Sequence, residues 1–99
     1  MAWSADLQEV KNLLIEALIA RCQQDVGGKH IMTPHTDPCR HLGICEEDLD
    51  EVQIDAARAV GLRPPFRGEP LIIPWHGPEA SNTIEDLAGW LAANGRPLT

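Results

Sequence analysis

Apolar residues recur at helical spacing in three segments of the chain, and the first of these segments predicts a long amphipathic helix. Its repeat comprises Leu7, Val10, Leu14, Ala17 and Leu18 and ends in the charged Arg21. Residues three or four positions apart lie on one face of an α-helix. Ser4 can cap the start by accepting a hydrogen bond from a backbone N–H, and Gly27 and Gly28 stop the helix. We therefore predict a helix over about residues 5–24.

The second and third segments predict two shorter helices, over about residues 46–60 and 83–93. Their apolar repeats comprise Leu49, Val52, Ala56 and either Ala59 or Val60, and then Ile84, Leu87, Ala88 and Leu91 with Trp90 at the edge. Gly61 is placed to end the second helix. Either Asn82 with Glu85 or Thr83 with Asp86 gives the third the pattern of a capping box.

Two irregular stretches separate the helices. Residues 29–44 show no sustained periodicity and predict a long loop, with core anchors at Ile31, Leu42 and Ile44. Residues 63–80 contain five prolines, which interrupt any helix. Within them, residues 71–75 (LIIPW) form the most hydrophobic run, which either covers the core, the interpretation we favour, or forms an exposed binding patch. The pattern predicts one all-α domain over residues 1–99, a small three- to four-helix bundle.

Composition and charge limit the classes of partner that this chain is expected to bind. The chain has 99 residues, is 43% hydrophobic, and carries 15 acidic against 8 basic residues for a net charge of −7. This charge repels phosphate backbones and anionic lipids, so we expect neither nucleic acid nor membrane as a partner and favour a basic protein surface. No apolar run is long enough to span a bilayer, and no secretory signal is recognisable.

Cysteine usage predicts a cytoplasmic protein with reduced thiols, because Cys22, Cys39 and Cys45 are odd in number and no signal peptide is seen. Cys45 precedes a predicted helix, where the helix dipole favours thiolate. The three acids that follow it oppose this by repelling negative charge. We therefore expect no strongly activated thiol.

Negative charge is concentrated on the second predicted helix. Between Cys45 and Val60 there is one base, Arg58, against six acids: Glu46, Glu47, Asp48, Asp50, Glu51 and Asp55. The helix dipole favours acids in the first turn, but its effect fades beyond that turn. The helix therefore presents either a solvated face or a recognition surface for a basic partner.

Four potential zinc ligands occur close together: His35, Cys39, His41 and Cys45, with His30 nearby. Their spacing is not that of a standard zinc finger, so we interpret them as ordinary loop and capping residues and keep a small zinc-binding protein as an alternative. The chain shows no complete catalytic motif and no glycine-rich phosphate loop, so we expect neither an enzyme nor a bound cofactor.

The order of these segments resembles that of acyl carrier proteins. The resemblance rests on the Thr/Asp loop at residues 31–37, on Leu42-Gly43-Ile44 ahead of the second helix, on the spacing to Gly61 and on residues 83–87 at the start of the last helix. It covers residues 7–91. It implies a helical bundle whose acidic second helix binds basic patches on partner enzymes.

The chain departs from the family where cargo is attached. Acyl carrier proteins place Asp-Ser-Leu after the Leu-Gly-apolar triplet and carry phosphopantetheine on that serine, whereas this chain has Cys45, Glu46 and Glu47. Because a glutamate offers no acceptor hydroxyl, we expect a non-acylated interaction module. We also expect the chain to be a monomer. The residues expected to bind the partner are Glu46, Glu47, Asp50, Glu51 and Asp55. The alternative is a carrier or thiol-dependent protein that loads a group directly on Cys45.

Overall fold

The described part of the chain is mainly helical, as the sequence predicts. The structure, a computed structural model, describes residues 7–27, 30–63, 83–94 and 96–97. Within them lie four helices, α1 (Leu7–Val26), α2 (Pro38–Leu42), α3 (Glu46–Ala59) and α4 (Ile84–Asn94). One addition to the all-α prediction is a two-residue antiparallel pair, β1 (Leu62–Arg63) with β2 (Arg96–Pro97).

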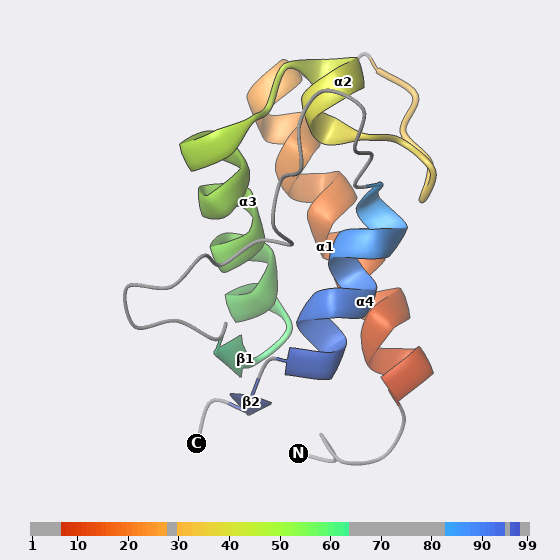
Figure 1. Cartoon of the computed structure of the whole chain (residues 1–99), viewed down its shortest axis with the longest axis vertical. Coiled ribbons are helices and arrows are strands. Elements are labelled where there is room, and N and C mark those ends of the chain that lie inside the picture. The colour runs from red at the N-terminus through yellow and green to blue at the C-terminus, as the bar shows by residue number, and fades with distance from the viewer. Residues whose placement is uncertain (1–6, 28–29, 64–82, 95, 98–99) are drawn as a thin grey trace.

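Helix α1 is the central element, and it packs along both α3 and α4 (Figure 1). Its buried stripe comprises Val10, Leu14, Leu18 and Cys22, spaced four residues apart. Leu7 was predicted to belong to this stripe, and that prediction is wrong because its side chain is 62% exposed. Leu7 is the first residue of α1, and burial along the helix begins only at Val10.

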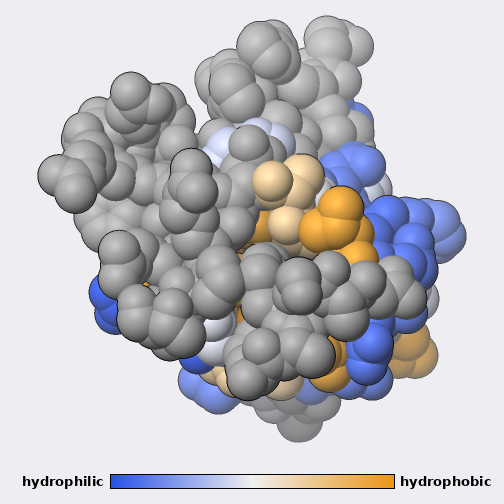
Figure 2. All heavy atoms as spheres, turned by 90° about the horizontal axis from the view of Figure 1, so that it is seen from below, coloured by the Kyte–Doolittle hydropathy of each residue, from blue (hydrophilic) through white to orange (hydrophobic). Residues whose placement is uncertain are grey.

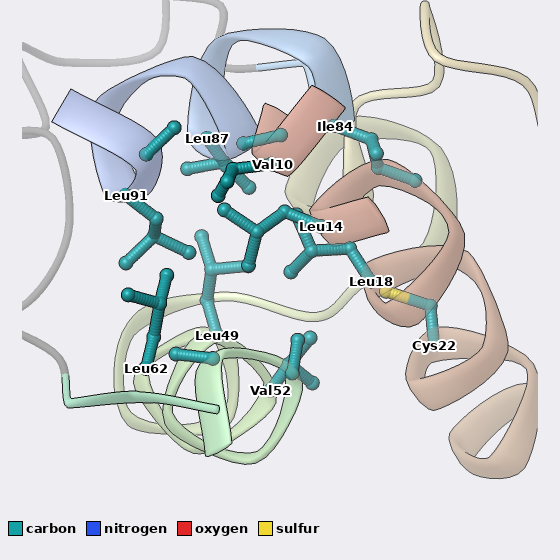
Figure 3. Close-up of a cluster of buried hydrophobic side chains, with 14 of the residues drawn as sticks. Val10, Leu14, Leu18, Cys22, Leu49, Val52, Leu62, Ile84, Leu87 and Leu91 are labelled. Atoms are coloured by element: carbon teal, nitrogen blue, oxygen red, sulfur yellow. The ribbon is translucent and has the colours of Figure 1, made fainter. Parts of the chain in front are cut away.

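The apolar faces of α3 and α4 meet α1 in one hydrophobic cluster (Figure 3). The predicted residues Leu49, Val52, Ala56, Ile84, Leu87, Ala88 and Leu91 are all buried in it. Of the two alternatives at the end of α3, Val60 packs against the cluster and Ala59 is exposed. Trp90 is partly buried at the cluster's edge. The three helix faces predicted from periodicity therefore form the core.

The ends of the long helices follow the predicted signals. Thr83 and Asp86 form a reciprocal capping box: each backbone N–H donates to the other's side-chain oxygen at 3.1 Å. Gly27 and Gly61 follow α1 and α3 with φ values of 85° and 82°, a backbone conformation that glycine adopts without strain. Ser4, Asn82 and residues 71–75 lie outside the described residues.

The stretch of residues 29–44 is not a continuous loop, because it contains α2. Pro38 occupies the first turn of this helix, Asp37 caps its start and Gly43 caps its end with φ 74°. Five residues are too few to produce a recognisable helical repeat, so the periodicity could not show α2.

Two of the three predicted core anchors in this stretch contact the core, and one does not. Ile44 is buried and Leu42 packs against the core, but Ile31 is 94% exposed, so its prediction is wrong. The loop before α2 is instead joined to α4 through its backbone: Ile84 N–H donates to the Thr36 carbonyl and Glu85 N–H to the Pro34 carbonyl, both at 2.9 Å.

Candidate functional site at the junction of α2 and α3

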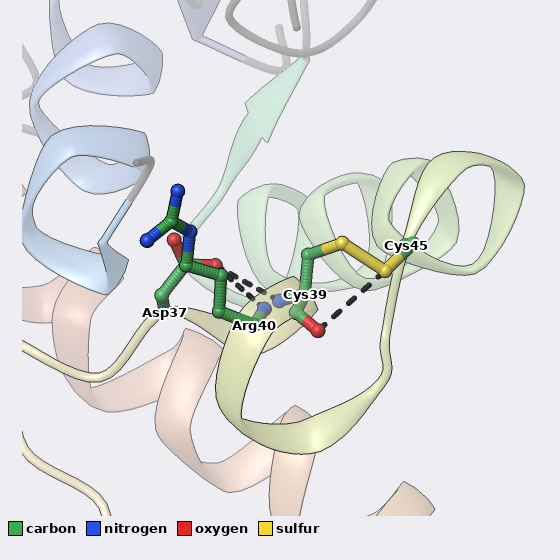
Figure 4. Close-up of a disulfide and its surroundings, with 4 residues drawn as sticks. All are labelled: Asp37, Cys39, Arg40 and Cys45. Atoms are coloured by element: carbon green, nitrogen blue, oxygen red, sulfur yellow. Dashed lines mark hydrogen bonds between the residues drawn. A yellow bond between two sulfur atoms is a disulfide. The ribbon is translucent and has the colours of Figure 1, made fainter. Parts of the chain in front are cut away.

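Asp37 organises the turn that leads into α2. Its Oδ1 accepts hydrogen bonds from the backbone N–H groups of Cys39 at 3.0 Å and Arg40 at 3.1 Å (Figure 4). These two N–H groups have no carbonyl partner inside the helix, so the carboxylate supplies what the first turn lacks. Asp37 is only 3% exposed. The cap is therefore part of the protein interior.

The end of α2 is closed by its own backbone. Gly43 N–H donates to the Cys39 carbonyl at 3.1 Å and Ile44 N–H donates to the Pro38 carbonyl at 3.0 Å. Such paired bonds, with glycine in the left-handed conformation, are a common way to end a helix. At the start of α2, His41 Nδ1 accepts a hydrogen bond from the Asp37 N–H at 2.9 Å.

A disulfide joins Cys39 to Cys45, with their Cα atoms 4.6 Å apart (Figure 4). The prediction of three reduced thiols is therefore wrong at these two positions. An odd cysteine count leaves one thiol unpaired, but it says nothing about which other two lie within bonding distance. The cytoplasmic location loses the support of reduced thiols and stays a prediction.

Cys22 is the free cysteine of the described part, and it lies in the core. Burial raises the pKa of its thiol from 9.0 to about 11, and the negative charge of Asp25 acts in the same direction. A thiol in this state is a poor nucleophile, because the thiolate is the reactive form. Cys22 therefore acts as a small apolar core residue.

The four zinc-ligand candidates are not brought together as a metal site. Cys39 and Cys45 share the disulfide, and His41 uses Nδ1 to accept a backbone hydrogen bond. His35 is exposed, and its Nδ1 lies 3.8 Å from an oxygen of Glu85. Across the described ranges, no group of three His, Cys, Asp or Glu residues is arranged to hold a metal ion.

The acidic residues of α3 differ in exposure and in whether they form ion pairs. Asp48 and Glu51 are exposed and form no ion pair with another described residue. Asp50 is half-buried. Glu46 and Glu47 form the first turn of the helix, and their side chains lie outside the described part.

Asp55 is engaged by α1. Its Oδ2 accepts from Arg21 Nε at 2.9 Å, and Arg21 Nη1 also lies 2.6 Å from Asp25 Oδ1. The hydrogen bonds to Asp55 and then Asp25 raise the pKa of the guanidinium above its already high value, so Arg21 stays charged at any ordinary pH. The charge of Asp55 is therefore offset within the protein, and Asp48 and Glu51 are the freest described acids of α3.

Gln53 is a buried polar residue that the apolar periodicity does not predict. It is fully buried, its Nε2 donates to the Leu49 carbonyl at 3.4 Å, and its Oε1 has no hydrogen-bond partner in the part that the structure describes. Position 53 follows Leu49 by four residues, so helical spacing alone places it on the core face. The apolar repeat does not include this position because the side chain of glutamine is polar.

Exposed hydrophobic side chains are few among the described residues. Leu7, Leu13 and Ile31 are the large ones. Seen from the end that carries β1 and β2, some hydrophobic atoms are visible near the centre of the view, with hydrophilic atoms to their right (Figure 2). No helix of the described part is both long and apolar enough to cross a bilayer.

Comparison with known proteins adds no assignment, because no family model, curated protein or solved structure matches the chain. The resemblance to acyl carrier proteins therefore rests on the sequence motifs alone.

Proposed function

We propose that this chain is a non-catalytic, carrier-protein-like module that binds a basic surface of a partner protein through the acidic face of α3. The observation that carries the proposal is the exposure of Asp48 and Glu51 without an ion-pair partner among the described residues. The opposite face of the same helix is committed to the core through Leu49 and Val52. The two roles of α3 are thus separated by its helical period.

The charge of α3 is suited to attracting a basic partner over a distance. From Glu46 to Ala59 the sequence holds six acids and one base, which gives a sum of −5. Clustered like charge of this kind raises the rate of association with a complementary surface. Salt weakens the attraction, since charges farther apart than about 8 Å are screened at physiological ionic strength.

Modification by phosphopantetheine is not part of the proposal. The position that corresponds to the family's attachment serine is Glu46, which lacks a hydroxyl. The alternative in which Cys45 carries the cargo requires a free thiol, and in the structure the sulfur of Cys45 is bonded to that of Cys39. Direct loading would therefore have to follow reduction.

Charge reversal tests the docking face. The double variant Asp48→Lys/Glu51→Lys changes two exposed acids of α3, and Glu9→Lys/Glu16→Lys changes two exposed acids of α1 by the same total charge. A basic partner is first isolated on the immobilised unmodified chain, and its association rate is then measured in low salt for all three proteins. We expect the α3 variant to associate at least about tenfold more slowly, within the range that electrostatic steering supplies.

The matched α1 variant separates a specific surface from net charge. If only total charge matters, the two variants lose association rate equally, and the proposal is wrong. Circular dichroism confirms that both variants remain folded, which is expected because all four side chains are exposed. In high salt the difference between the α3 variant and the unmodified chain should shrink.

A further inference from the structure

The Cys39–Cys45 disulfide has no role in the proposed docking function. It closes a short segment with a sequence separation of 6, and it joins α2 to the residue that precedes α3. Both cysteines are partly exposed, unlike Cys22, which is fully buried. Access of an external thiol is a requirement for exchange with a disulfide, and the pair meets it.

The fold around the disulfide is held by contacts that do not involve either sulfur. Asp37 caps the start of α2 through two N–H bonds, and Gly43 and Ile44 donate to carbonyls at its end. Ile44, next to Cys45, is buried in the core. These contacts fix the chain on both sides of the disulfide, so we expect α2 and α3 to stay in place when the S–S bond breaks.

Cys45 has a neighbouring carbonyl that a reduced thiol can use as a hydrogen-bond acceptor. Its Sγ lies 3.6 Å from the Cys39 carbonyl oxygen (Figure 4). While the disulfide is intact the sulfur carries no proton and cannot donate. After reduction the two sulfurs must move apart, and a Cys45 thiol that stays near this carbonyl can donate weakly to it. Cys45 is the N-cap residue of α3 and its side chain makes no capping bond, so α3 does not depend on the sulfur.

We infer that Cys39 and Cys45 form a redox-active pair that exchanges with an external dithiol, a role independent of the proposed docking function. A thiolate of the reductant attacks one sulfur, the S–S bond breaks, and the other cysteine leaves as a thiolate and takes up a proton. The second thiol of the reductant then displaces the first cysteine. The reductant becomes a disulfide, and the protein gains two electrons and two protons.

The test uses the full chain, oxidised beforehand, and dithiothreitol as the dithiol. The protein is equilibrated in native buffer with mixtures of reduced and oxidised dithiothreitol, then alkylated with iodoacetamide and weighed intact. We expect two labels to appear together while Cys22 stays unlabelled. A tenfold change in the ratio of oxidised to reduced dithiothreitol should change the ratio of disulfide to dithiol protein about tenfold.

The control variants identify the thiols and guard against unfolding. Cys22→Ser should keep the two-label transition, and Cys45→Ser should abolish it. Far-UV circular dichroism of the reduced Cys22→Ser protein decides the matter if Cys45→Ser fails to fold, because the reduced form should keep its helical signal. The inference is overturned if the disulfide does not form in oxidised dithiothreitol, or if reduction releases all three thiols together through unfolding.

Discussion

The core and the α2 junction of this small protein are held by different kinds of interaction. The core joins α1, α3 and α4 through buried aliphatic side chains such as Leu14, Leu49 and Leu87. The junction, over residues 36–45, is fixed by the Asp37 cap and by backbone bonds at the end of α2, and it also contains the disulfide. One region depends on removing apolar area from water, and the other on satisfying polar groups within a few residues.

The difference shows how a five-residue helix can be ordered. A helix of this length is unstable alone, because nucleation costs more than one or two intrahelical bonds return. In α2 a cap at each end supplies the missing hydrogen-bond partners, and Ile44, two residues after the helix, is buried in the core. Local polar contacts thus extend the structure where apolar periodicity is too short to do so.

The largest effect is expected in the core. Leu49→Ala removes most of a side chain that is 5% exposed, and it should lower the free energy of unfolding by about 2–5 kcal/mol. Leu13→Ala is the matched control, since Leu13 is 47% exposed and its loss should change stability by less than about 0.5 kcal/mol. Urea unfolding of both variants measures the difference. Equal losses would mean that α3 does not pack as described.

A smaller effect is expected at the junction. Asp37→Ala removes the acceptor for two N–H groups of α2 and should cost about 1 kcal/mol, and up to about 2 kcal/mol because the site is buried. Thr83→Ala removes the equivalent cap of α4 and provides the comparison. Hydrogen exchange should accelerate at Cys39 and Arg40 in the first variant alone. Unchanged exchange there would show that the cap does not hold α2.

The smallest effect is expected where α1 and α3 meet through charge. Arg21→Gln removes both of its ion pairs, yet Asp25 and Asp55 are substantially exposed, with side chains 37% and 48% accessible. Exposed pairs of this kind contribute about 0.2–1 kcal/mol. Thermal unfolding at low and high salt should show a small loss that salt reduces. A loss as large as that of Leu49→Ala would place Arg21 among the core contacts.

The sequence predicts the core better than the junction. Periodicity identifies Leu49, Val52 and Leu91 because each repeats an apolar residue at helical spacing, and Thr83 with Asp86 is a capping signal with a fixed separation.

The disulfide could not be inferred from the sequence, because α2 brings the two cysteines together and the apolar periodicity does not show α2. Gln53 was missed since a polar residue on an apolar face breaks the pattern on which the reading depends. Among the candidate docking acids, Asp55 pairs with Arg21 of α1. The sequence alone does not show this pair, because the two residues belong to different helices.

The packing of α1 against α4 also has a consequence for synthesis. The Lys11–Glu85 ion pair joins residues 74 positions apart, and the α1 stripe is completed by side chains of α4. Because loop closure over such a separation must precede the contacts that reward it, long-range pairing slows folding. A ribosome makes α1 before α4. The part of the apolar stripe of α1 that α4 covers therefore stays uncovered until α4 has been made.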